Sequence, residues 1–242
     1  LYGNYMLIVM GVQTLMTAMF NSMNAGIGNL VAEGDKRKIM SVFAELFSIR
    51  FLFSCIMCFG VLMITPAFVS FWIGKKYVMD SLSLLLMTAI LFVNLSRTTV
   101  DAYINAYGLF GDIWAPIVEA SLNVGLSIIL GYYFGLHGVL SGVLISLLLV
   151  VFCWKPYYLF RKGLDERLSI YIFMYARHLM AALLCGVIVC LGMRYSMVQG
   201  DTTFFDGLLG ILVFSILSTL TLLCVAPGMR NLMRRFIRMC HV

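Results

Sequence analysis

Residues 42–69 read VFAELFSIRFLFSCIMCFGVLMITPAFV, and this run holds only two charged side chains, Glu45 and Arg50. A helix that crosses the hydrocarbon core of a bilayer needs about 20 mostly apolar residues. A membrane-spanning strand would instead alternate polar and apolar positions over about 10 residues, a pattern that the run lacks. The run therefore predicts a transmembrane helix.

Further apolar runs occupy most of the remaining chain. Of its 242 residues, 62% are hydrophobic and 12% are charged, a balance outside the range of soluble domains. We expect an all-α membrane protein with about seven transmembrane helices. The expected spans are residues 2–31, 42–69, 81–107, 115–134, 139–160, 170–193 and 204–226.

The basic residues are divided unequally between the two ends of these spans. Thirteen of the 17 Lys and Arg residues fall on one side and three on the other, while Arg97 falls inside a span. Short loops rich in Lys and Arg remain in the cytoplasm. We therefore expect an integral membrane protein with Leu1 outside and the tail from Arg230 inside.

The sequence contains none of the motifs of the common enzyme classes. It has no phosphate-binding glycine loop, no paired histidines at metal-ligand spacing and no nucleophile elbow. We expect no enzyme activity, catalytic residue, cofactor or metal. Cys55 and Cys58 have the spacing of a zinc knuckle but no second ligand pair, so we expect them to be small buried apolar side chains. The net charge of +6 lies at the ends of the spans, so nucleic acid is not an expected partner.

Polar residues follow one another along the expected third span. Asn94, Arg97, Asp101 and Asn105 have three- and four-residue spacing, which places them on one helical face. An arginine in the middle of a membrane costs at least about 2.5 kcal/mol, so this face must turn towards protein or water. It either lines a hydrophilic cavity as a substrate-binding surface, or it holds an Arg97–Asp101 ion pair that stabilises the bundle.

A second polar stripe follows the expected first span, with Gln13, Thr17, Asn21 and Asn24 on one face. Amides donate and accept hydrogen bonds, so these side chains suit either sugar hydroxyls or a neighbouring helix. In the fourth span, Glu119 is a candidate for coupling to an ion, and it alternatively complements the helix dipole.

Glycines recur at four-residue spacing around the fourth and fifth spans. Gly131 is followed by Gly135, and Gly138 by Gly142. Small residues at this spacing let helix backbones approach one another closely in a membrane. We expect the two spans to pack closely together.

The tail is basic and amphipathic. As a helix, it would place Arg230, Arg234, Arg238 and His241 on one face and apolar side chains on another. Such helices lie in the membrane interface, where anionic lipids attract their basic face.

Several short stretches resemble the second half of a polysaccharide exporter. They are YGNY at residues 2–5, GNLVAEGDK at 28–36, EASLN at 119–123 and GLHGV at 135–139. With them the chain resembles the Wzx-type lipid-linked oligosaccharide flippases of the multidrug/oligosaccharidyl-lipid/polysaccharide exporter superfamily. The resemblance covers essentially the whole chain, is strongest around residues 33–35 and the third to fifth spans, and is weak in the last two spans.

This resemblance implies a two-lobe fold of which the chain is helices eight to fourteen, a fragment without the first lobe. Residues 1–160 would form most of the second transport lobe, residues 161–228 two additional transmembrane helices, and residues 229–242 the basic cytoplasmic tail. The family moves an undecaprenyl-pyrophosphate-linked oligosaccharide to the outer leaflet by alternating access, for surface polysaccharides such as the O-antigen of lipopolysaccharide. The expected partners are this substrate, membrane lipids and the polysaccharide polymerase machinery.

The resemblance also implies roles for particular residues. Basic cavity residues of the family receive the pyrophosphate, and Arg97 matches that role in position, with Asp101 orienting it. The arginine fork donates two hydrogen bonds to a phosphate. A drug exporter of the same superfamily is an alternative, and would favour an acidic cavity. A membrane enzyme of polysaccharide assembly is a further alternative, but would need a larger outside loop than the roughly ten residues expected here.

Overall fold

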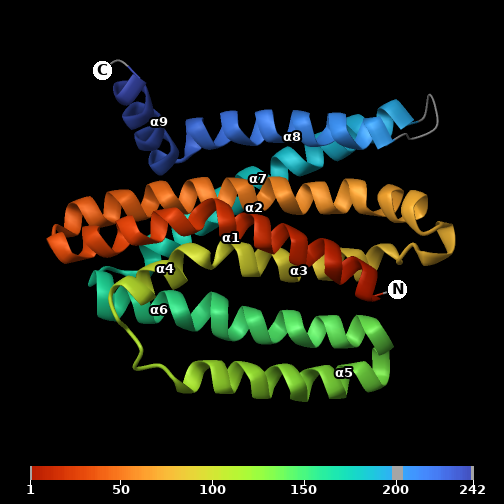
Figure 1. The fold of residues 1–242 in the computed structure, drawn as a ribbon, viewed down its shortest axis with the longest axis horizontal. Coiled ribbons are helices and arrows are strands. Elements are labelled where there is room, and N and C mark those ends of the chain that lie inside the picture. Colours follow the sequence, from red (N-terminus) through yellow and green to blue (C-terminus); the bar gives the residue numbers. More distant parts are fainter. Residues whose placement is uncertain (1, 198–203, 241–242) are drawn as a thin grey trace. The chain divides into compact units, whose positions relative to one another are not determined.

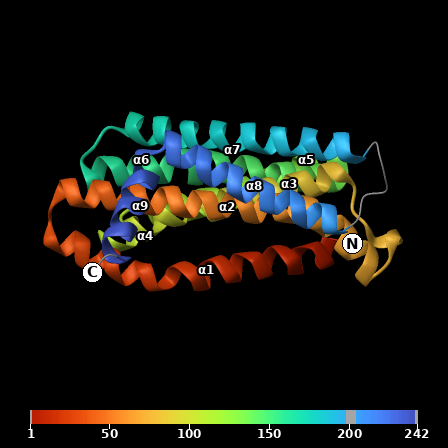
Figure 2. The same ribbon diagram turned by 90° about the horizontal axis from the view of Figure 1, so that it is seen from above.

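The computed structural model describes residues 2–197 and 204–240, and every regular element in these residues is helical (Figures 1 and 2). Six helical stretches are long and apolar enough to cross a membrane. These features confirm the prediction of an all-α membrane protein. The α-helices are α1 (Tyr2–Glu33), α2 (Lys36–Trp72), α3 (Ser81–Ser96), α4 (Thr98–Ala106), α5 (Trp114–Leu147), α6 (Lys155–Leu159), α7 (Leu168–Met197), α8 (Phe204–Val225) and α9 (Pro227–Cys240).

Three shorter segments have other helical geometries. The segment η1 (Lys75–Tyr77) is a 3-10 turn, whereas η2 (Leu148–Trp154) and η3 (Phe160–Leu164) are π-helices on either side of α6. A π-helix has wider turns than an α-helix and often occurs near functional residues. Pro156 is the second residue of α6 and has no backbone N–H to donate. The backbone before it therefore lacks one helical hydrogen bond, and this is where the wide turns of η2 lie.

The second span begins earlier than the sequence predicted. Helix α2 starts at Lys36 rather than near residue 42, and only Gly34 and Asp35 separate it from α1. The Asp35 carboxylate accepts hydrogen bonds from the backbone N–H groups of Arg37 and Lys38, at 3.0 and 3.2 Å. Asp35 therefore caps the helix and lets it start inside the expected loop.

The expected fourth and fifth spans form a single helical stretch, Trp114–Leu164, that folds back on itself. The fold occurs at Gly135, where φ is 58° and ψ is −133°, a conformation that favours glycine. Behind it the two legs touch: a Cβ added to Gly138 would lie 1.9 Å from the Leu130 carbonyl oxygen, and one added to Gly142 would lie 2.6 Å from the Ser127 nitrogen. The predicted close packing of these spans is confirmed.

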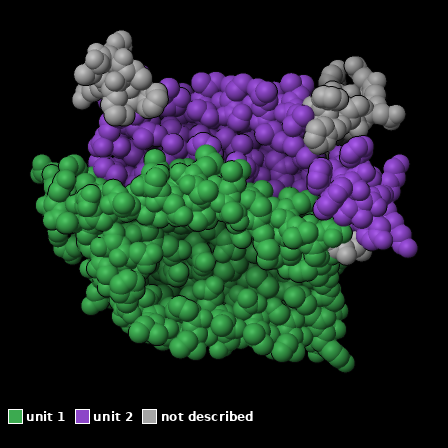
Figure 3. Space-filling view, viewed as in Figure 1, with its two compact units in different colours: residues 1–39, 79–170 green, residues 40–78, 171–242 purple. Residues whose placement is uncertain are grey.

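The described residues form two compact units, coloured separately in Figure 3. Unit 1 comprises Leu1–Ile39 and Met79–Ile170, and unit 2 comprises Met40–Val78 and Tyr171–Val242. This grouping does not follow chain order, because α2 passes from unit 1 into unit 2 after Ile39, and α7 does so after Ile170.

Unit 1 is built on α1, α3, α4 and the hairpin that α5 begins. Val93 of α3 packs against Leu147 at the end of α5 and Val151 of η2. The Tyr5 hydroxyl of α1 accepts a hydrogen bond from the backbone N–H of Met79, at 2.9 Å. Helix α4 lies beside both α1 and α6.

Unit 2 is held by aromatic and apolar side chains of α2, α7 and α8. The Phe47 ring lies 5.7 Å from that of Tyr171 and 5.3 Å from that of His178. Phe59 stacks on Phe214 of α8 at 4.3 Å between ring centroids. In both units many large apolar side chains remain exposed, as expected of helices whose outer faces contact lipid.

Asp80 fixes the start of α3. Its carboxylate lies 2.7 Å from His137 Nε2, in the α5 hairpin turn, and accepts a 3.0 Å hydrogen bond from the Ser83 backbone N–H. The hydrogen bond from His137, followed by that from Ser83, holds the pKa of Asp80 well below its usual range. The ionised carboxylate is therefore the form that connects the two segments.

We predict that Asp80→Ala lowers the melting temperature in detergent at pH 7 by roughly 2–4 °C, because it removes a helix cap. A carboxylate with a lowered folded pKa contributes stability that is fully present above the unfolded pKa of about 4 and is lost as the pH falls through the folded value. The difference between variant and parent should therefore shrink below pH 4. Equal melting temperatures at pH 7 would contradict this role.

Candidate functional site

Arg97 lies at an interruption between two helices. Helix α3 ends at Ser96 and α4 begins at Thr98, and Arg97 connects them with φ −71° and ψ −18°. The two helices together form one candidate membrane span. The side chain is therefore held where the helix is irregular, within an apolar segment.

The guanidinium of Arg97 has two carboxylates beside it. Its Nε lies 3.4 Å from Oδ2 of Asp101, one turn further along, and its Nη1 lies 3.9 Å from Oε1 of Glu119 in α5. Asp101 also accepts a hydrogen bond through Oδ1 from Nζ of Lys155, at 2.8 Å. We call Arg97, Asp101, Glu119 and Lys155 the charged network.

Lys155 is brought to the network by the geometry of its own segment. It is the first residue of α6 and directly follows the π-helix η2. Its neighbour Trp154 packs against Trp114, the first residue of α5, with ring centroids 4.6 Å apart. The buried Trp154 Nε1 has no hydrogen-bond partner among the described residues. A positive charge and an unused N–H donor thus occupy adjacent positions.

The charged network is partly accessible. The exposed fraction of the side chain is 29% for Arg97 and Asp101, 22% for Glu119 and 19% for Lys155. At a rise of 1.5 Å per residue, the four residues lie about 8–14 Å from the nearer ends of their helical stretches. Those ends belong to the side that the basic residues predict to be cytoplasmic. The Arg97–Asp101 ion pair is thus present, and part of each of its two side chains is exposed.

Two cations and two carboxylates make the network neutral. Compensation of this kind is needed, because an uncompensated charge at this depth is costly. The 3.9 Å contact of Arg97 with Glu119 is beyond hydrogen-bond distance, so it is the weakest contact of the network. An anion that enters can therefore compete for Arg97 and Lys155 while the carboxylates are released.

Asn94 and Asn105 flank the network along the chain without joining it. Asn94 is half-buried and Asn105 is exposed. Within residues 2–197 and 204–240, neither side chain donates or accepts a hydrogen bond. That Asn94 and Asn105 line one surface with Arg97 stays a prediction. The contacts of the network join Arg97 to Asp101 and Glu119, and Asp101 to Lys155.

The amide stripe of α1 lies beside the buried face of that helix. The buried face carries Met16, Phe20 and Ile27, and the stripe lies roughly a quarter-turn away. Asn21 and Asn24 are exposed and Gln13 is half-buried. The Asn24 side chain donates to Asn21 Oδ1 at 3.5 Å. The stripe and the network both belong to unit 1, and their use of one cavity stays a prediction.

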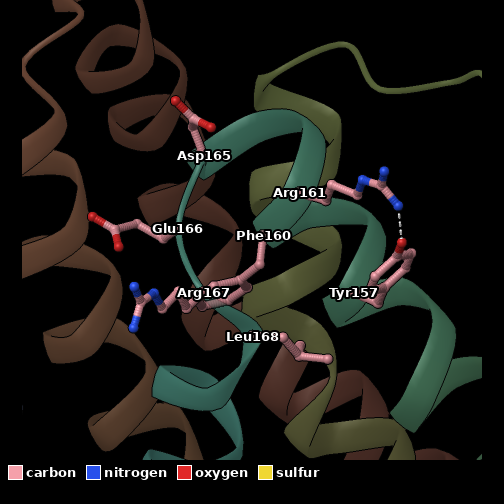
Figure 4. A pocket seen from close by; sticks show the side chains of 7 residues that line it. All are labelled: Tyr157, Phe160, Arg161, Asp165, Glu166, Arg167 and Leu168. Atoms are coloured by element: carbon pink, nitrogen blue, oxygen red, sulfur yellow. Dashed lines mark hydrogen bonds between the residues drawn. The ribbon is translucent and has the colours of Figure 1, made fainter.

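A pocket of about 540 Å³ lies where η3 leads into α7. Figure 4 shows Tyr157 and Arg161 on one side of it, joined by a hydrogen bond, and Glu166 and Arg167 on the other. It is lined by Tyr157, Phe160, Arg161, Asp165, Glu166, Arg167 and Leu168, and by none of the residues predicted from the sequence to bind substrate. Lys36 of α2 pairs with Asp165 at 2.9 Å, so this rim is already partly neutralised.

Lys155 is the member of the network that sequence reasoning missed. Lys155 is one of the thirteen basic residues that the sequence places at the cytoplasmic ends of the spans, whereas in the structure it bonds Asp101 from another helix. Lys155 lies nine residues before the end of the helical stretch, and its position in the sequence does not distinguish a lysine that flanks the membrane from one that enters it. Glu119 lies 3.9 Å from Arg97, and its binding of an ion or its effect on the helix dipole stays a prediction.

Metal ligands are not grouped in the described part of the chain: no three His, Cys, Asp or Glu residues there could hold an ion together. Cys55 and Cys58 are buried, at 7% and 6% exposure. Comparisons with protein-family models, curated proteins and solved structures find none that matches the chain.

Proposed function

We propose that the chain is the membrane part of a transporter that moves an undecaprenyl-pyrophosphate-linked oligosaccharide to the outer leaflet of the bacterial cytoplasmic membrane. The observation that carries this proposal is the charged network: two cations lie within an apolar helical unit, partly exposed, and are held by carboxylates rather than by tight burial. The substrate class comes from the resemblance to Wzx-type flippases.

The network supplies the chemistry that a pyrophosphate needs. Arg97 and Lys155 both contact Asp101, so one diphosphate can reach both cations by displacing one carboxylate. Arginine offers two parallel N–H donors and lysine a compact charge, and both form strong hydrogen bonds with phosphate oxygens. The Trp154 indole N–H, one residue before Lys155 in the chain, is a further donor without a described partner.

Release follows from the same contacts. When the substrate leaves, Asp101 and Glu119 recover their cationic partners, so the empty site is neutral and stable between cycles. The helix interruption at Arg97 and the π-helix before Lys155 are points at which their helices can bend. Bending there is the movement that alternating access requires of this unit.

The oligosaccharide would contact the amide stripe of Gln13, Asn21 and Asn24, whose side chains bond sugar hydroxyls as donors and acceptors. Asn94 and Asn105 would extend that surface along α3 and α4. The proposed orientation places the network near the cytoplasmic side, where the substrate is assembled. Other members of the export pathway, including a polymerase, would receive the product outside.

We predict that Arg97→Ala in the complete gene product lowers export at least tenfold, because each charged hydrogen bond to phosphate contributes about 1.5–3 kcal/mol. Export is measured as surface polysaccharide in a strain that lacks the chromosomal gene, with membrane protein abundance measured beside it. Lys162→Ala is the matched control, since Lys162 is an exposed cation outside the network. Its variant should export normally.

Two outcomes would contradict the proposal. Normal surface polysaccharide with Arg97→Ala would remove the network from the transport cycle. Unchanged polysaccharide together with loss of cationic dye efflux would assign the chain to the drug exporters instead. Loss of protein from the membrane would be separated from loss of transport by Arg97→Lys, which keeps the charge and should keep both folding and part of the export.

A further inference from the structure

Helices α2, α7 and α9 meet closely at one point of unit 2. A Cβ added to Gly228 of α9 would lie 2.3 Å from the Ala44 carbonyl oxygen and 2.7 Å from the Ser48 hydroxyl, both in α2. The same Ser48 hydroxyl lies 2.9 Å from Nε2 of His178 in α7. The start of α9 is therefore fixed against α2, at a serine that also bonds α7.

This junction brings two arginines together. Arg177 precedes His178 in α7, and Arg230 follows Gly228 by two residues in α9; their charges are close enough to repel each other. Arg177 lies over the Phe173 ring at 5.8 Å, and its buried Nε has no hydrogen-bond partner. No described carboxylate lies within ion-pair distance of Arg177, Arg230 or Arg234. Two like charges thus lie near this junction, and neither has a described carboxylate as its partner.

Arg235 of α9 has a carboxylate partner and a different role. Arg235 lies 3.3 Å from the Glu45 carboxylate, which is only 4% exposed. Met229 of α9 is buried in a cluster with Leu222 of α8 and Leu52 of α2. These contacts hold one face of α9 on the unit and leave the Arg230 face free of them.

The outward surface of α9 combines charge with apolar side chains. Arg230 and Arg234 are exposed one turn apart, and beside them Met233 and Ile237 are 46% and 50% exposed. This arrangement is typical of a helix in the membrane interface, with apolar side chains among the acyl chains and basic side chains at the headgroups.

The direction of α9 agrees with that placement. It begins two residues after α8 ends, and in Figures 1 and 2 it turns sharply away from the axis of α8. Helix α8 is long and apolar enough to cross the membrane. A helix that turns away from it at its end therefore runs along the membrane surface, on the side expected to be cytoplasmic.

We propose that Arg177 and Arg230 form a binding site for the headgroup phosphate of an anionic phospholipid. The half-buried guanidinium of Arg177 in α7 and the exposed guanidinium of Arg230 in α9 supply donors from two helices, and the exposed Arg234 adds a third charge. Met233 and Ile237 contact the acyl chains of the same lipid. The exposed apolar pair distinguishes a lipid from a soluble phosphate or an acidic peptide, neither of which would cover it.

The test compares lipid binding by the full chain purified in a neutral detergent. Native mass spectrometry measures the affinity for phosphatidylglycerol and for phosphatidylcholine. Each removed charge should weaken phosphatidylglycerol binding about fivefold, and Arg177→Gln/Arg230→Gln roughly 20–30-fold, with phosphatidylcholine unchanged. Lys75→Gln, the same change at an exposed residue of the opposite side, is the matched control and should have no effect.

Three results would overturn the proposal. These are unchanged phosphatidylglycerol binding by the double variant, an equal loss for both lipids, and full displacement of the lipid by an equal concentration of inorganic phosphate. If the double variant fails to fold, Arg177→Lys/Arg230→Lys decides the matter, because it keeps the charges but not the forked donors. Its affinity for phosphatidylglycerol should lie between that of the parent at low salt and that of the parent in 1 M salt. An affinity equal to that of the parent in 1 M salt would contradict the site.

Discussion

Gly138→Ala should destabilise the protein strongly, because the added methyl group has no space between the two legs of the α5 hairpin. It would lie 1.9 Å from the Leu130 carbonyl oxygen, a backbone atom that cannot turn aside. Overpacking of this kind costs about 1–3 kcal/mol or more, since the helices must separate. The measurement is the melting temperature of the purified protein in detergent, which we expect to fall by several degrees.

Gly125→Ala is the control for this variant. Gly125 lies in the first leg of the same hairpin, and a Cβ there has no atom within 4 Å. Replacing a helical glycine with alanine at an open position should leave stability unchanged or raise it by up to about 1 kcal/mol. Equal melting temperatures for Gly138→Ala and the parent would show that the two legs do not pack as described.

Asp101→Ala should have the second large effect, because Asp101 neutralises two cations at once. Its loss leaves Arg97 with only the 3.9 Å contact to Glu119, and leaves Lys155 without a described carboxylate. Breaking a fully buried pair costs 3–5 kcal/mol, and partial exposure reduces this to about 1–3 kcal/mol. The expected result is a lower melting temperature, and reduced export in cells.

A double variant makes this prediction specific. Asp101→Ala/Lys155→Ala removes one carboxylate and one cation, so it should be more stable than the sum of the single effects predicts by about 0.5–3 kcal/mol. Asp112→Ala serves as the control, because the Asp112 side chain makes no ion pair with a described residue. Additive losses for Asp101 and Lys155 would show that the two side chains are not coupled.

The sequence predicted the helical elements well because the length of an apolar run decides whether a helix crosses a bilayer. The run of residues 42–69 lies within α2, and the expected turn at residues 135–138 contains the break at Gly135. The start of α2 was predicted too late, since capping by Asp35 is a hydrogen-bond effect that a hydropathy pattern does not contain.

The candidate site was only partly predictable. The spacing of Arg97 and Asp101 gave their ion pair as one of two alternatives, because one helical turn separates them, and the structure contains that pair. Glu119 and Lys155 join through contacts between helices, which a single sequence does not specify. Lys155 was hidden for a further reason: a lysine near the end of an apolar run has the same appearance whether it flanks the membrane or enters it.

The π-helix before Lys155 determines which neighbour its ammonium group can meet. Each residue of an α-helix advances by about 100° around the axis, whereas wider turns advance by less. Over the seven residues of η2 this difference accumulates into a rotation of everything that follows. If the segment tightened into ordinary α-helical turns, Lys155 would swing round the axis away from Asp101. The winding of one short segment therefore sets the direction of the Lys155 side chain, and with it whether the ammonium group reaches Asp101.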